Sequence, residues 1–66
     1  MKDDEYSELK STFLTLVAAV PLPLRKEIIA VVNNSAVNWD VAAEEVRRDG
    51  PQAKLIIKQL KKVGLL

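Results

Sequence analysis

Apolar residues recur at three- and four-residue steps along the first third of the chain, which is the spacing of one face of an α-helix. The residues on this stripe are Tyr6, Leu9, Phe13, Leu16, Val17 and Val20. Acidic residues at positions 3, 4, 5 and 8 suit the positive end of the helix dipole. Pro21 and Pro23 end the pattern, because proline interrupts the hydrogen-bond ladder. We therefore predict an amphipathic helix from about Asp4 to Val20.

A second apolar stripe follows, formed by Leu24, Ile28, Val31 and Val32. Its valine-rich part is also compatible with a strand, but the flanks and the spacing favour a helix over about Leu24–Val32. Residues 33–35, two asparagines and a serine, compete for backbone hydrogen bonds and favour a turn. We expect them to end this second helix.

The rest of the chain predicts two helices joined by a turn at residues 47–50. The third helix begins near Asn38, a good N-cap, and we expect the adjacent Trp39 to anchor the core, although a tryptophan could also stack on a base. The fourth runs from Pro51 to about Val63, and Gly64 is expected to end it in a left-handed conformation. Its inward arc consists of Ala53, Ile56, Ile57 and Leu60. The predicted fold class is all-α, with four short helices in a single domain of residues 1–66.

The amino-acid composition limits the kinds of catalytic and metal-binding site that the chain can form. The chain has 66 residues and contains neither cysteine nor histidine, which excludes disulfides and thiolate metal sites and removes the usual proton carrier near neutral pH. Glu44 and Glu45 would point about 100° apart on a helix, so they cannot act as a carboxylate pair. We expect them to pair with Arg47 and Arg48 instead. With no converging cluster of catalytic side chains, we predict neither an enzyme nor a bound metal or cofactor.

The formal net charge of +1 hides an asymmetry along the chain. Residues 1–45 hold four basic and eight acidic side chains, whereas residues 46–66 hold six basic side chains against Asp49 alone. Such polarity suggests a partner surface at the basic end, although lysines along a helix are often only solvated. The acidic start has the wrong sign for a secretory signal, so we expect a cytoplasmic protein.

The last two predicted helices share a regular spacing of small and apolar residues, namely Ala43, Val46, Ala53, Ile57, Leu60 and Gly64. This spacing resembles the helix-turn-helix core of small bacterial and archaeal winged-helix regulators. Residues 24–32 look like the support helix of that family, so the resemblance covers residues 24–66, and the wing that would follow Leu66 is absent. The resemblance implies a trihelical, helix-turn-helix-like core preceded by the amphipathic helix of residues 1–20.

The resemblance also implies a transcription-associated protein that binds double-stranded DNA through the basic helix 51–63, which would lie in the major groove. An amide such as that of Gln52 would contact a base, and the cationic side chains would contact phosphates. The expected nucleic-acid-binding residues are Arg47, Arg48, Gln52, Lys54, Leu55, Lys58, Lys61 and Lys62. Two features oppose DNA binding: the negative charge of Asp49 at the start of the helix, and the outward-pointing Leu55. The alternative is a non-enzymatic adaptor domain that uses Leu55, Lys58 and Lys62 to contact a protein.

The apolar stripe of the first helix is broader than one neighbouring helix needs, because Leu14, Ala18 and Ala19 widen it. We therefore predict a homodimer formed through residues 6–20, which would present two recognition helices to paired DNA half-sites. The alternative is a closed monomeric bundle with Leu14 and Ile29 packed inside.

Overall fold

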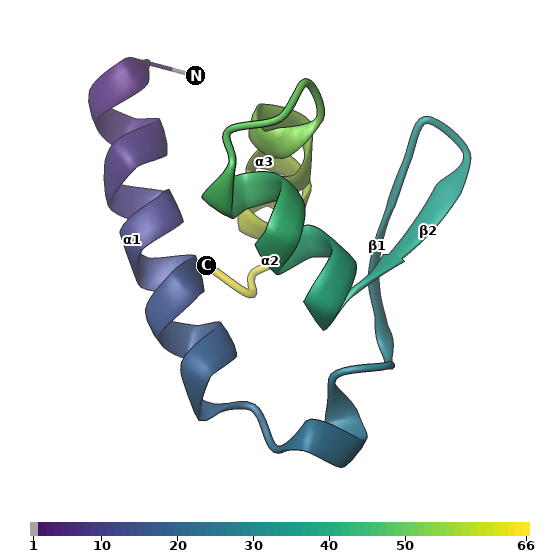
Figure 1. The fold of residues 1–66 in the computed structure, drawn as a ribbon. Coiled ribbons are helices and arrows are strands. Elements are labelled where there is room, and N and C mark those ends of the chain that lie inside the picture. The colour runs from purple at the N-terminus through teal and green to yellow at the C-terminus, as the bar shows by residue number, and fades with distance from the viewer. Residues whose placement is uncertain (1) are drawn as a thin grey trace.

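The computed structural model describes residues 2–66, which form three α-helices, one short 3-10 helix and a two-stranded antiparallel sheet. In chain order the elements are α1 (Asp3–Ala19), η1 (Leu22–Leu24), β1 (Ile28–Val32), β2 (Ser35–Asn38), α2 (Trp39–Arg47) and α3 (Ala53–Lys62). The hairpin lies on one side of the α2–α3 pair and α1 lies on the other (Figure 1). The predicted fold is thus correct in being mainly helical and wrong in consisting of helices alone.

The first, third and fourth predicted helices are confirmed as α1, α2 and α3. Asn38 caps α2 as expected, since its side-chain Oδ1 accepts a hydrogen bond from the backbone N–H of Val41 at 2.8 Å. The C-terminal end of α1 is held by Arg25, whose guanidinium donates to the backbone carbonyls of Val17 and Val20. Gly64 has a φ of 87° and ends α3 in the expected left-handed conformation.

The predicted second helix over Leu24–Val32 is wrong, because this stretch forms η1 and then strand β1. Strands β1 and β2 pair with Val32 opposite Ser35 and Val31 opposite Ala36. The two residues between the strands, Asn33 and Asn34, have φ values of 52° and 64°. These are the left-handed conformations of a tight hairpin turn, which asparagine tolerates better than most residues. The asparagines therefore reverse a strand instead of ending a helix.

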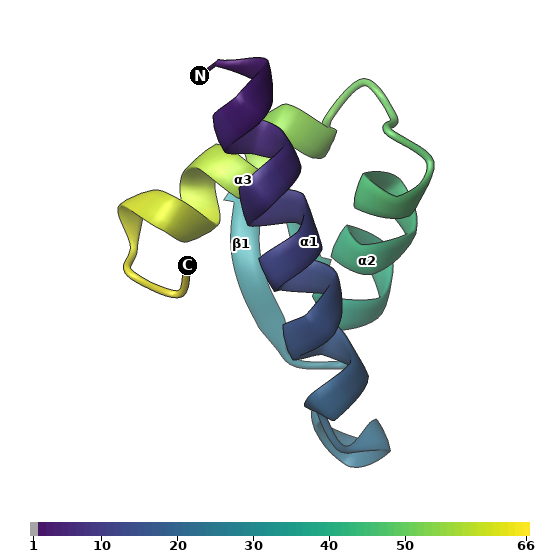
Figure 2. The same ribbon diagram turned by 90° about the vertical axis from the view of Figure 1, so that its left-hand side faces the viewer.

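One hydrophobic core joins all the major elements. Its largest fully buried side chains are Phe13, Val17, Val46, Ile56, Ile57 and Leu60. The ring of Phe13 on α1 stacks on that of Trp39 with centroids 6.0 Å apart, so Trp39 anchors the core as expected. Figure 2 shows α1 crossing in front of α2 and α3, and it contacts both helices. The N-terminal helix is therefore part of the domain's own core and is not an addition outside a trihelical unit.

Candidate functional site

The turn between α2 and α3 is built around Glu45, whose side chain is only 11% exposed. Its carboxylate accepts a hydrogen bond from the backbone N–H of Gln52 at 2.8 Å and pairs with the guanidinium of Arg48. Both contacts lower the pKa of Glu45, and the backbone N–H of Gln52 is the larger cause. A Cβ atom at Gly50 would collide with this carboxylate, so a larger residue at position 50 would require the Glu45 side chain to shift. The expected pairing of Glu45 with Arg48 is confirmed, whereas Glu44 forms no ion pair with any of residues 2–66.

Asp49 connects the same turn to α1 through its side chain. Its backbone has a φ of 50°. Its carboxylate accepts hydrogen bonds from the hydroxyl of Tyr6 at 2.8 Å and from the ammonium of Lys10 at 2.9 Å. These two donors lower the pKa of Asp49. Burial, together with the carboxylate, raises the pKa of Tyr6 to about 12. The negative charge that we expected to oppose a ligand at the start of α3 is therefore bound by residues of α1.

One flank of α3 is neutralised by the acidic first turn of α1. The ammonium of Lys54 lies 3.3 Å from the carboxylate of Asp3, and that of Lys61 lies 2.7 Å from the carboxylate of Glu5. The contact with Lys61 lowers the pKa of Glu5. Two of the lysines predicted to contact DNA phosphates thus already face carboxylates of the same chain.

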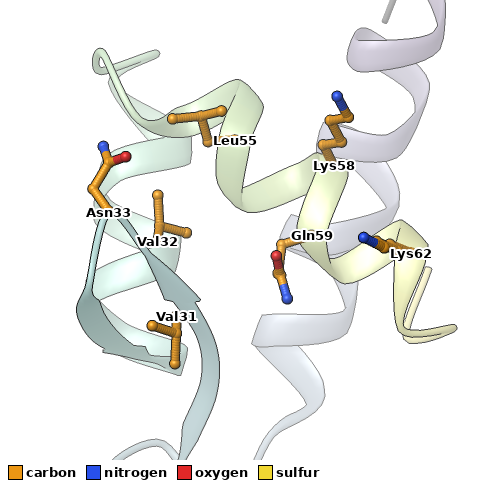
Figure 3. Close-up of a pocket in the computed structure, with 7 residues that line it drawn as sticks. All are labelled: Val31, Val32, Asn33, Leu55, Lys58, Gln59 and Lys62. Carbon is orange, nitrogen blue, oxygen red and sulfur yellow. The ribbon is translucent and has the colours of Figure 1, made fainter.

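The other flank of α3 borders a groove, which we call the β1–α3 groove. It is a hollow of about 220 Å³ lined by Val31, Val32, Asn33, Leu55, Lys58, Gln59 and Lys62. In Figure 3 the first three of these come from β1 and its turn and the other four come from α3, where Gln59 lies toward the strand and the side chain of Lys58 points away from it. Val31 is 57% exposed and Leu55 is 45% exposed. Exposed apolar side chains from two separate elements therefore line one groove.

Lys58 and Lys62 stand beside these apolar residues and form no ion pair with any of residues 2–66. They differ in this respect from Lys54 and Lys61 on the same helix, which face acids of α1. The groove thus combines an apolar floor with two available ammonium groups. Such an arrangement suits a ligand that has an apolar side chain flanked by negative charge.

The eight residues predicted for DNA binding are spread over the end of α2, the following turn and α3, and three of them, Lys58, Lys61 and Lys62, line a second hollow together with Glu5. Leu55, Lys58 and Lys62 come together at the β1–α3 groove. Lys54 and Lys61 lie on the α1 flank, Arg47 and Arg48 lie at the end of α2, and Gln52 is the N-cap of α3. Sequence reasoning missed the strand side of the groove, Val31 to Asn33, because it treated this stretch as helix. The available signal was a run rich in β-branched residues followed by two asparagines.

Among residues 2–66, no group of three or more histidine, cysteine, aspartate or glutamate side chains is arranged to hold a metal ion. No helix in this range is both long and apolar enough to span a lipid bilayer. No protein-family model matches the chain, and no curated protein or solved structure is significantly similar to it. The β1–α3 groove is therefore the feature of this chain that points to a function.

Proposed function

We propose that this chain is a small protein-interaction domain that binds an acidic segment of a partner protein in the β1–α3 groove. The observation that carries the proposal is the meeting of exposed Val31 and Leu55 beside Lys58 and Lys62, neither of which has an acidic partner among residues 2–66. It corresponds to the adaptor alternative drawn from the sequence and adds a strand to the expected contact surface.

The apolar floor favours a protein ligand. Single exposed apolar residues are ordinary on protein surfaces, but two from separate elements in one groove offer a site for a partner's apolar side chain. Full burial of a valine or leucine side chain contributes about 1.5–3 kcal/mol, and each of these two retains about half of its surface for a partner to cover. A phosphate backbone has no group that would gain from this contact.

The charges favour an acidic ligand of modest size. Lys58 and Lys62 would attract carboxylates at the rim of the groove and accelerate association at low salt. A longer polyanion would extend over α3 and meet the acidic first turn of α1 beside Lys54 and Lys61. The repulsion from Asp3 and Glu5 would limit the gain from each additional phosphate.

DNA binding is the second candidate, and one observation favours it. Helices α2 and α3 follow each other across a short turn, and Arg47 at the end of α2 is exposed and has no ion-pair partner in residues 2–66. Arg47, Lys58 and Lys62 are the cations left for phosphates. Three such contacts would give a slope of log K against log salt of about −3, shallower than a larger basic surface would give.

The proposal is tested by panning a phage-displayed library of random twelve-residue peptides on the protein and measuring the recovered peptides by fluorescence anisotropy. We expect recovered peptides to be acidic and to bind at micromolar concentrations. Leu55→Asp should abolish binding, because it places a charge on the apolar floor. The matched control is Leu22→Asp, which changes an equally apolar residue on η1 that is 77% exposed and lies outside the groove.

A labelled mixed-sequence DNA duplex is titrated in parallel over a range of salt concentrations. The proposal is overturned if no peptide is enriched over the Leu55→Asp protein, or if the duplex binds more tightly than every recovered peptide at physiological salt. In the second case the basic helix is a nucleic-acid surface. Lys58→Glu combined with Lys62→Glu should then remove DNA binding.

A further inference from the structure

We propose that the β1–α3 groove takes its partner as an added β-strand, so that an extended acidic segment of another protein pairs with the free edge of β1 and contacts α3 with its side chains. This inference rests on the proposed function and specifies the conformation of the partner. It predicts recognition through main-chain hydrogen bonds as well as side chains.

The groove runs along the edge of β1. Val31 and Val32 are neighbours in a strand, so their side chains point to opposite faces, and Val31 is exposed whereas Val32 is buried in the core. Both nevertheless line the groove, together with Asn33 at the turn. A hollow that touches consecutive residues from both faces of a strand lies beside its edge. In Figure 3 this edge faces the side chains of Leu55 and Gln59 on α3.

The register of the hairpin shows which backbone groups face the groove. In a hairpin with a two-residue turn, the flanking pair exchanges both backbone hydrogen bonds and the next pair exchanges none. The flanking pair here is Val32 with Ser35, and the next is Val31 with Ala36. The N–H and C=O of Val31 therefore point away from β2, and the sheet has no third strand among residues 2–66. A partner strand would satisfy both groups.

The charges identify the partner as acidic and as different from this chain. Lys58 and Lys62 line the groove beside the free edge. A second copy that paired β1 with β1 would bring its own two lysines to the same place, where like charges repel. A nucleic acid has no main-chain N–H and C=O pattern to complete a sheet. An extended peptide with an apolar residue over Leu55 and carboxylates at neighbouring positions satisfies the strand edge, the floor and the lysines together.

The test uses the tightest-binding peptide recovered from the random library, remade with a single N-methyl group at each position in turn. N-methylation removes one main-chain donor and leaves the side chain unchanged. For a strand paired with β1, binding should weaken about tenfold or more at every second position of the paired segment and change little at the positions between. If the loss of affinity along the N-methyl series does not show this period of two, strand addition is overturned, even if binding of the peptide still depends on Leu55.

A matched pair of protein variants tests the same contact from the other side. Val31→Pro removes the outward N–H, at a position where an edge strand accepts proline, and should weaken peptide binding about tenfold. Val31→Thr keeps the N–H and the branched shape and should bind within about twofold of the original. Circular dichroism checks that both variants fold, and if Val31→Pro does not, the N-methyl series decides alone.

The possible outcomes separate the two proposals. Failure to enrich any peptide overturns the interaction domain and the strand together. Peptides that bind and depend on Leu55 but show no N-methyl period and no effect of Val31→Pro overturn only the strand. Sedimentation velocity showing a dimer that Val31→Pro dissociates would assign the edge of β1 to a second copy and overturn the acidic partner.

Discussion

The hydroxyl of Tyr6 gives the most direct test of how α1 is attached to the rest of the domain. Tyr6 is 9% exposed, and its hydroxyl donates to Asp49, so burial and the neighbouring carboxylate raise its pKa from 10.0 to about 12. In the unfolded chain the phenol ionises near pH 10. The folded state therefore retains its proton when the unfolded state has lost it, and stability should fall as the pH rises from about 10 to about 12.

The size of the effect follows from the shift. Two pKa units correspond to roughly 3 kcal/mol of unfolding free energy, which is present in full below pH 10 and lost by about pH 12. This is a large part of the stability expected of a domain of this size. Because alkaline pH changes more than this one hydroxyl, the variant Tyr6→Phe is needed as a reference. It keeps the contact between Lys10 and Asp49 and removes only the ionisable hydroxyl.

The measurement has two parts. Because the chain contains a single tyrosine, absorbance at 295 nm during an alkaline titration reports the ionisation of Tyr6 alone. Urea unfolding, followed by circular dichroism at several pH values, then gives the stability of both proteins. We expect an absorbance midpoint near 12, or at the pH of unfolding if that comes first, and a steeper loss of stability in the original protein than in Tyr6→Phe. A midpoint near 10, with parallel stability curves, would refute the attachment of α1 through this hydrogen bond.

The other predictions concern the core, the caps, the turn and the oligomeric state. Phe13→Ala should lower the unfolding free energy by about 3–5 kcal/mol in urea denaturation, because it leaves a cavity beneath Trp39; a loss below about 1 kcal/mol would contradict the packing of α1 described above. Asn38→Ala should cost about 1 kcal/mol and Asn38→Asp much less, since aspartate also caps α2; equal losses would argue against the cap. The lowered pKa of Glu45 means that its contribution to stability is present above the unfolded pKa and is lost as the pH falls through the folded value, so the unfolding free energy of the original protein, followed by tryptophan fluorescence, should decrease along an acid limb. Glu45→Gln should flatten this acid limb, and an unchanged limb would mean that another carboxylate controls it. The predicted dimer through residues 6–20 is tested by sedimentation equilibrium of the original protein and of Leu14→Glu. We expect a dimer that Leu14→Glu dissociates, and a monomer in both proteins would contradict the prediction.

The helices could be predicted from the sequence because their apolar residues leave clear polar faces between them. The stretch from Ile28 to Val32 was ambiguous, since it is apolar at every position and a helical stripe can be drawn through it as easily as a strand. Asn33 and Asn34 were the deciding residues. Asparagines disfavour a helix interior and so could end either a helix or a strand, but they also tolerate the left-handed conformation that a two-residue hairpin turn requires, and this second property distinguishes the hairpin.

The candidate site was predictable only on its helical side. Leu55, Lys58 and Lys62 follow from the outer face of α3, whereas Val31 lines the groove only because β1 lies beside that helix. The pairing of Lys54 with Asp3 joins residues at opposite ends of the chain. Periodicity within one element carries no information about such a contact. The charge asymmetry was visible in the sequence, but folding cancels part of it.

The ion pairs between α1 and α3 give the two flanks of one helix different responses to salt. A ligand carboxylate that displaced Asp3 from Lys54, or Glu5 from Lys61, would replace one fixed counterion with another. Few ions would leave for the solution, and binding at that flank would be nearly independent of ionic strength. Lys58 and Lys62 have no such counterion on residues 2–66, so a ligand in the groove would release ions from solution and lose affinity as salt is added. The salt dependence of any ligand therefore identifies the flank of α3 on which it sits.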